Sequence, residues 1–101
     1  MKISIPKETT LDETRVAATP QSVKELIKAG YEVNIETGAG TSSFISDDDF
    51  KNAGANIVNT TNELFKDSDL IIKVAAPTND EIELMPKGSI LISFFSTHYR
   101  T

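Results

Sequence analysis

Two basic residues combine a chemistry and a position that suit the binding of an anion. Arg15 lies between a short apolar run, residues 3–5, and a helical pattern that begins at Pro20. Lys73 interrupts an apolar run, residues 70–74, close to its carboxyl end. A guanidinium binds a carboxylate or phosphate through two parallel hydrogen bonds, and an ammonium in a cleft binds a carboxylate or exchanges protons. The competing interpretations are a solvated loop arginine and a lysine that extends to solvent or pairs with an acid.

Other polar residues fall at corresponding points of the sequence. Glu8 and Glu13 lie in the segment that carries Arg15, and Ser96 and His98 follow the last apolar run. Because the carboxyl ends of parallel strands meet at one edge of a sheet, we expect these side chains to gather there. The two acids either orient the arginine or are solvated. The sequence thus predicts a cleft for a small anionic ligand, with the two basic residues as its cations.

Composition excludes several other kinds of function. The chain has 101 residues and a formal net charge of −5, which disfavours nucleic acid and anionic membrane surfaces as partners. It has no cysteine and one histidine, which excludes disulfides, thiolate catalysis and a metal site built from several histidines. The first residues lack a signal-peptide pattern, and no apolar run approaches the roughly 18 residues of a membrane span. We therefore expect a cytoplasmic protein that does not insert into a membrane.

Short apolar runs alternate with helical patterns along the whole chain, and turn or cap residues separate them. Thr19, Ser46, Thr60 or Thr61, and Thr78 are predicted N-caps, and Glu81 stands where a capping-box partner of Thr78 would lie. The predicted strands are residues 3–5, 31–36, 55–58, 70–74 and 89–95, and the predicted helices are 20–28, 47–53, 60–65 and 79–85.

Strands separated by short helices indicate βαβ units and a parallel sheet. We predict an α/β fold, a flavodoxin-like three-layer sandwich with a mostly parallel sheet of about five strands. The run 70–74 is typical of a strand that is covered on both faces. No helical pattern follows the last strand, which would leave that strand poorly covered. We therefore expect an N-terminal fragment of a two-domain protein.

A pair of glycines after the second predicted strand invites comparison with a dinucleotide-binding loop. That fingerprint requires a third glycine where Ser43 stands, a helix that starts at once, and an acid about 20 residues later. None of these is clearly present, so Gly38 and Gly40 are interpreted as turn residues. The chain is expected to lack its own phosphate-binding loop, and no cofactor-binding residue can be assigned.

Several separated motifs together resemble one family. They are residues 5–8 (Ile-Pro-Lys-Glu), 13–20 (Glu-Thr-Arg-Val-Ala-Ala-Thr-Pro), 36–40 (Glu-Thr-Gly-Ala-Gly), 53–55 (Ala-Gly-Ala) and 69–74 (Asp-Leu-Ile-Ile-Lys-Val). In this order they resemble the N-terminal domain of the alanine dehydrogenase and nicotinamide nucleotide transhydrogenase family. The resemblance covers nearly the whole chain, to about Phe95.

Within that family, three segments look more like the α subunit of a proton-translocating transhydrogenase: residues 17–20, 74–77 and 80–82. Alanine dehydrogenases usually carry leucine where Ala18 stands. They also place a catalytic histidine at the position that aligns with Ser96. His98 would take that acid–base role only after a shift of two residues.

The resemblance implies a two-domain enzyme in which residues 1–101 form the N-terminal, substrate-type segment. The NAD-binding Rossmann domain would follow beyond residue 101. In alanine dehydrogenases, the positions that match Arg15 and Lys73 hold the carboxylate and carbonyl of pyruvate. In transhydrogenases, the similar domain forms part of the cleft that closes over NAD(H), while hydride passes to NADP(H) on another subunit.

Three functions are open at this stage. The first is part of a transhydrogenase, with NAD and NADP as cofactors of the full enzyme. Its partners would be the Rossmann domain, a second copy in a homodimer, and an NADP(H)-binding or membrane subunit, through which the protein would associate with a membrane. The second is part of an NAD-dependent alanine dehydrogenase, and the third is a stand-alone, non-catalytic binding domain. The 101-residue chain alone is expected to bind no cofactor tightly and to show no turnover.

Overall fold

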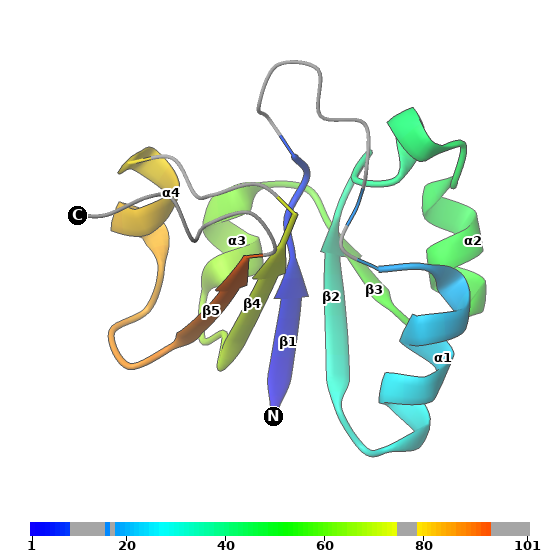
Figure 1. Cartoon of the computed structure of the whole chain (residues 1–101), viewed down its shortest axis with the longest axis horizontal. Helices are drawn as coiled ribbons and strands as arrows, with labels where there is room; N and C mark the ends of the chain where they lie inside the picture. Colours follow the sequence, from blue (N-terminus) through cyan, green and yellow to red (C-terminus); the bar gives the residue numbers. More distant parts are fainter. Residues whose placement is uncertain (9–15, 17, 75–78, 94–101) are drawn as a thin grey trace.

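Five strands form a single parallel sheet in the order β3-β2-β1-β4-β5 (Figure 1). The computed structural model describes residues 1–8, 16, 18–74 and 79–93. The strands are β1 (Lys2–Ile5), β2 (Glu32–Glu36), β3 (Asn56–Val58), β4 (Leu70–Lys73) and β5 (Ile90–Ser93). The helices are α1 (Pro20–Lys28), the 3₁₀ turn η1 (Thr41–Ser43), α2 (Asp47–Asn52), α3 (Thr61–Phe65) and α4 (Asn79–Leu84).

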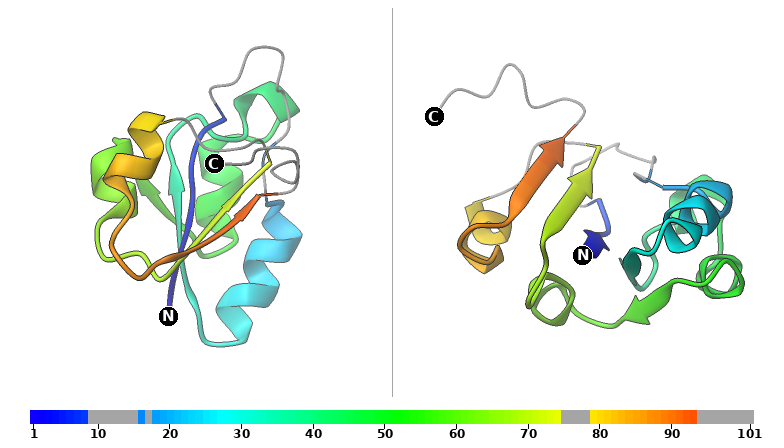
Figure 2. Two further views of the ribbon diagram at one scale, coloured as in Figure 1. Left: turned by 60° about the vertical axis from the view of Figure 1, so that its left-hand side comes forward. Right: turned by 90° about the horizontal axis from the view of Figure 1, so that it is seen from below.

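The helices cover the sheet from both sides. Figure 2 shows α1 and α2 on one face and α3 and α4 on the other. Each face has its own hydrophobic core. Val23 of α1 and Phe50 of α2 pack with Ile5 and Ile35 on the first face, and Leu64 and Phe65 of α3 pack with Ile71 on the second. The predicted three-layer α/β sandwich is therefore confirmed, with a sheet that is parallel in every described pairing.

The order of the strands departs from the flavodoxin-like order of 2-1-3-4-5. Here β3 lies at the edge beside β2, and β1 is the central strand between β2 and β4. This 3-2-1-4-5 order is that of the dinucleotide-binding folds. The chain reverses direction across the sheet between β1 and β4, and ligands of open α/β sheets bind outside the carboxyl ends of the strands at such a point.

The helix boundaries follow from the predicted cap residues. Thr19, Ser46 and Thr60 cap α1, α2 and α3, and each side-chain oxygen accepts a hydrogen bond from the backbone N–H three residues later, at 3.1, 3.1 and 3.2 Å. Thr60 is thus the cap of α3, while the hydroxyl of Thr61 donates to Glu36 at 3.0 Å. The fourth predicted cap, Thr78, lies outside the described residues.

Two features that the described residues lack bear on function. Among the helices that the structure describes, none is long and apolar enough to cross a membrane. Within the same residues, no group of three or more histidine, cysteine, aspartate or glutamate side chains could hold a metal ion.

Candidate functional site

Of the residues that the sequence singles out for this edge, the structure describes Lys73 and Glu8. Arg15, Glu13, Ser96 and His98 lie outside the described residues, so their proposed roles stay predictions. Lys73 is the last residue of β4, and β4 pairs with the central strand β1. The lysine therefore stands where the strand order reverses, at the edge predicted for a ligand.

The side chain of Lys73 is buried in spite of its charge. Because side chains alternate along a strand, Lys73 and Ile71 face the same side of the sheet, the side covered by α3 and α4. The lysine side chain is 1% exposed, and a buried ammonium requires partners that replace water.

Two carboxylates supply those partners. The Nζ atom of Lys73 lies 3.2 Å from Oε1 of Glu8 and 3.3 Å from Oε2 of Glu81, and donates a hydrogen bond to each. The side chains of Glu8 and Glu81 are 2% and 9% exposed. Glu8 also accepts a hydrogen bond from the backbone N–H of Val74, at 2.9 Å. We call Glu8, Lys73 and Glu81 the buried triad.

The triad decides between the interpretations that the sequence leaves open. Lys73 pairs with acids rather than extending to solvent, and Glu8 is not solvated. The triad consists of one ammonium and two carboxylates, and Glu8 and Glu81 each have a further interaction besides the contacts given above. An ammonium has three hydrogens, and the described bonds of Lys73 use two of them. The third is the group that could bind a ligand.

The triad joins three segments of the fold at the ligand edge. Glu8 follows β1, Lys73 ends β4, and Glu81 comes from α4. The neighbouring strand β5 also makes a polar contact at this edge. The hydroxyl of Ser93, at the end of β5, donates a hydrogen bond to the backbone carbonyl of Val74 at 3.4 Å. The carboxyl ends of β1, β4 and β5 are therefore connected through polar side-chain contacts.

The glycine turn after β2 has a structural explanation. Gly38 has a φ of +76°, a conformation that favours glycine. A Cβ atom on Gly40 would lie 2.7 Å from a ring carbon of Phe50 and 2.8 Å from the carbonyl oxygen of Ile45. The carboxylate of Asp47 accepts the backbone N–H of Gly38 at 2.9 Å, which places an acid at the turn. These contacts support the interpretation of both glycines as turn residues.

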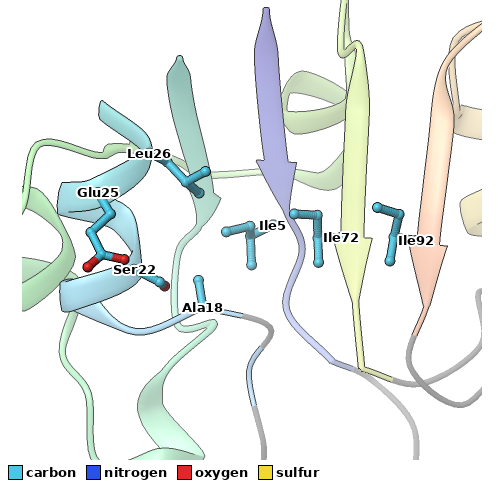
Figure 3. Close-up of a pocket in the computed structure, with 7 residues that line it drawn as sticks. All are labelled: Ile5, Ala18, Ser22, Glu25, Leu26, Ile72 and Ile92. Carbon is cyan, nitrogen blue, oxygen red and sulfur yellow. The ribbon is translucent and has the colours of Figure 1, made fainter. Parts of the chain in front are cut away.

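A cavity of about 370 Å³ lies on the opposite face of the sheet, between α1 and the strands β1, β4 and β5 (Figure 3). Ile72 and Ile92 line it together with residues of β1 and α1, and Ile92 and Ile90 are 44% and 58% exposed. Because Ile72 and Lys73 are consecutive in β4, they face opposite sides, so this cavity is separate from the buried triad. The expected poor covering of the last strand is confirmed for this face of β5.

Sequence reasoning missed the role of Glu81 and part of the role of Glu8. Glu81 was predicted as a capping-box partner of Thr78, which lies outside the described residues, and the contact described for Glu81 is with Lys73 on β4. The sequence feature that could have indicated this role is the position of Glu81, an acid eight residues after the lysine of the apolar run 70–74. Glu8 is separated from Lys73 by 65 residues, which no local pattern indicates.

Comparisons with known proteins agree with this architecture. Residues 4–101 match the family model described as "Alanine dehydrogenase/PNT, N-terminal domain". The chain is 46% identical over 94 residues to an alanine dehydrogenase of Mycolicibacterium smegmatis. The matched region covers 93% of this chain and 25% of that protein. It is 44% identical over 94 residues to the NAD(P) transhydrogenase subunit alpha of Haemophilus influenzae, with coverage of 93% and 18%. The chain thus spans a quarter or less of the length of these relatives.

Solved structures of both an alanine dehydrogenase and a transhydrogenase are similar to this chain. An L-alanine dehydrogenase superimposes with a TM-score of 0.87 at 36% identity, over 92% of this chain and 26% of that one. A transhydrogenase from Sinorhizobium meliloti also gives a TM-score of 0.87, at 35% identity, over 92% of this chain and 27% of that one. The chain therefore belongs to the alanine dehydrogenase/PNT N-terminal domain family, whose relatives include oxidoreductases of both kinds.

Proposed function

We propose that the chain is the N-terminal part of the α subunit of an NAD(P) transhydrogenase, an enzyme that transfers hydride between NAD(H) and NADP(H). The observation that carries this proposal is the pairing of Lys73 with both Glu8 and Glu81 at 3.2 and 3.3 Å. A lysine that served a carboxylate substrate would need to present its ammonium to that substrate, whereas the Lys73 side chain is 1% exposed and already donates to two carboxylates. The transhydrogenase-like segments 17–20, 74–77 and 80–82 support the same choice.

In this role the chain supplies one wall of a cleft. Hydride transfer requires two nicotinamide rings held against each other with water excluded, and the cofactors themselves carry the chemistry. The buried triad at the ends of β1 and β4 would form a rigid polar part of that wall. The nucleotide-binding Rossmann domain would be supplied by chain beyond residue 101.

The proposed second domain is supported by coverage and by the exposed strand. The chain spans 18% and 25% of the two curated relatives named above. Parallel sheets are normally covered on both faces, yet Ile90 and Ile92 of β5 are substantially exposed. We infer that further chain of the complete protein covers this face. A homodimer and an NADP(H)-binding or membrane subunit belong to the same proposal, with NAD and NADP as cofactors and the subunit at the cytoplasmic side of a membrane.

The second candidate is an NAD-dependent alanine dehydrogenase. It is favoured by the identity of 46% to the enzyme of M. smegmatis. Under this proposal Arg15 and Lys73 hold the substrate, and His98 acts as the acid or base. Lys73 then has to bind the substrate while it is buried and donates to two carboxylates, which argues against this candidate.

The test uses the complete gene product that carries this sequence, together with any subunits encoded beside it. Reduction of a chromophoric NAD analogue by NADPH, with a rate that does not change when L-alanine is added, is the expected result. NADH formation that requires L-alanine would instead establish the dehydrogenase. A reading frame that stops at Thr101, with no turnover in either assay, would favour a stand-alone binding domain.

A further inference from the structure

Phe44 combines two unusual properties at one residue. Its side chain is 97% exposed, the highest value among the large apolar residues that the structure describes. Its φ is +62°, in the left-handed region that glycine and asparagine adopt far more readily than a bulky residue does. We propose that Phe44 anchors this chain to the domain that the complete protein carries beyond residue 101, at a patch of that domain that joins an apolar side chain to basic ones. The inference rests on the proposed function, which places a second domain there.

The turn that carries Phe44 fixes this conformation. The N–H of Phe44 donates to the carbonyl of Thr41 at 3.1 Å, and the N–H of Ile45 donates to the carbonyl of Gly40 at 2.9 Å. Ile45 packs against the core of the first face, so its neighbour Phe44 is left outside that core. The fold of this chain gains nothing from an exposed ring at a left-handed position. Backbone strain of this kind is typical of sites that bind a ligand or a partner.

The position of Phe44 suits a contact with the second domain. The turn η1 follows β2, and Figure 1 shows the segment between β2 and α2 beyond the carboxyl ends of the strands. This is the edge at which the proposed cleft closes. The matched region makes up 25% and 18% of the two curated relatives named above, so most of each relative lies outside it. A ring that projects from this edge is among the first groups that further chain on the other side of the cleft would meet.

The surface around the ring suits a protein side chain better than a small molecule. A hollow of about 250 Å³ beside Phe44 is lined by Thr41, Ile45 and Ser46. Small-molecule sites usually have volumes of at least about 300 Å³ and enclose most of the ligand. An aromatic ring beside a small hollow is instead typical of protein interfaces, in which a ring inserts into the partner and the hollow receives a side chain in return.

Acidic side chains beside the ring define the chemistry of the partner. The first turn of α2 carries Asp47, Asp48 and Asp49. Asp47 and Asp49 accept hydrogen bonds within this segment, whereas Asp48 is exposed. These charges repel the phosphates of a nucleotide and the same turn of a second copy, which disfavours both a stacked nucleotide and a symmetric dimer contact. They attract basic side chains, so the partner patch is expected to be basic around its apolar residue.

The experiment places the photo-crosslinking residue p-benzoylphenylalanine at position 44 of the complete gene product. Irradiation is expected to join residue 44 to a segment beyond residue 101 of the same chain. Such a cross-link leaves the chain monomeric on a denaturing gel, and mass spectrometry of its peptides locates it. Position 31 is the matched control, because Tyr31 is an aromatic residue, 38% exposed, that precedes β2 and lies at the opposite edge of the sheet. It should give no such cross-link.

The charge argument is tested in the same assay. Asp48→Lys reverses an exposed charge and leaves the described hydrogen bonds of Asp47 and Asp49 in place. It should lower the rate of cross-linking about threefold, the scale expected for the loss of an exposed ion pair. Glu83→Lys changes the net charge equally at an exposed position of α4 and should leave the rate unchanged.

The products of irradiation decide the outcome. Cross-links confined to residues 1–101, a cross-linked dimer, a cross-link to another protein, or no cross-link would each overturn the inference. So would a rate that Asp48→Lys does not lower. If the labelled protein does not fold, hydrogen exchange of the Phe44→Gly complete protein decides, since glycine removes the ring and relieves the turn. Exchange should become faster in a segment beyond residue 101, and unchanged exchange there overturns the inference.

Failure of this inference can be told apart from failure of the proposed function. The expected cross-link in a protein that does not exchange hydride between NAD(H) and NADP(H) contradicts only the proposed function. Hydride exchange by a complete protein that lacks the cross-link contradicts only the role of Phe44.

Discussion

The carboxylate of Glu8, just beyond the central strand β1, accepts hydrogen bonds from both Lys73, the last residue of β4, and the backbone N–H of Val74, the residue that follows. Its two oxygens accept from the Lys73 ammonium at 3.2 Å and from the N–H of Val74 at 2.9 Å. One side chain thereby ties the end of β1 to the end of β4, the point where the strand order reverses. A ligand site at this edge would be built on a fixed polar frame.

Removing the ammonium of Lys73 should destabilise the fold strongly. Lys73→Met leaves Glu8 and Glu81 buried without their shared cation, and breaking a buried ion pair by removing one partner costs about 3–5 kcal/mol. Urea unfolding followed by circular dichroism measures this free energy. Lys24→Met, at an exposed position of α1, should change it by less than about 0.5 kcal/mol. Equal stabilities for the two variants would show that the triad does not support the fold.

The substitution Glu8→Gln tests whether both oxygens of Glu8 are needed as acceptors. Glutamine keeps one acceptor but turns an NH₂ group toward either Lys73 or the Val74 amide, which are both donors. We expect a loss of about 1–3 kcal/mol in the free energy of unfolding, the cost of a buried donor without a partner. Glu63→Gln, on the exposed side of α3, is the control and should be close to neutral. A neutral Glu8→Gln variant would mean that the two-point bond is not required.

Gly40 is required by close packing rather than by its backbone angle. Its φ is −97°, which any residue adopts, so alanine without a clash would stabilise by about 0.4–1 kcal/mol through the unfolded state. The added Cβ instead meets Phe50 and the carbonyl of Ile45 at 2.7 and 2.8 Å, so Gly40→Ala should destabilise by about 1–3 kcal/mol. Thermal or urea unfolding gives the sign. A stabilised variant would contradict the packing of this turn.

Gly30→Ala separates this steric effect from backbone strain. Gly30 has a φ of +99°, and no atom lies within 4 Å of the position that the Cβ of an alanine would take. Its substitution should therefore cost about 1–2 kcal/mol through the left-handed backbone alone. Because the φ of Gly40 is unstrained, a loss of stability in Gly40→Ala can be assigned to packing, whereas the loss in Gly30→Ala reports the backbone conformation alone.

The exposed face of β5 should affect association more than stability. Ile92 is 44% exposed, so Ile92→Ser is expected to change the free energy of unfolding by less than about 1 kcal/mol. It should also lower the self-association of the 101-residue chain, measured by light scattering against concentration, because it reduces an exposed apolar patch. Ile71→Ser, at a fully buried position of the adjacent strand, should cost at least about 3 kcal/mol. A large loss at Ile92 would show that this face is already packed.

Much of the fold could be predicted because its signals are local. Each predicted strand and helix is present, and the helices begin where Thr19, Ser46 and Thr60 satisfy the first free amides. Helix capping and the alternation of apolar residues act over three or four positions, so a linear sequence displays them. The strand order could not be predicted from local patterns, because β3 would have the same sequence pattern beside β2 or at another position in the parallel sheet.

The sequence by itself determined that this is an α/β chain with a lysine near the end of a strand that is covered on both faces, and it pointed to the family. Only the tertiary structure decided what that lysine does. Glu8 lies 65 residues from Lys73, and Glu81 approaches it across a helix–strand connection. A buried charge requires partners that lie close to it in space and replace water. The spacing of residues along the chain shows neither which residues are close in space nor which are buried.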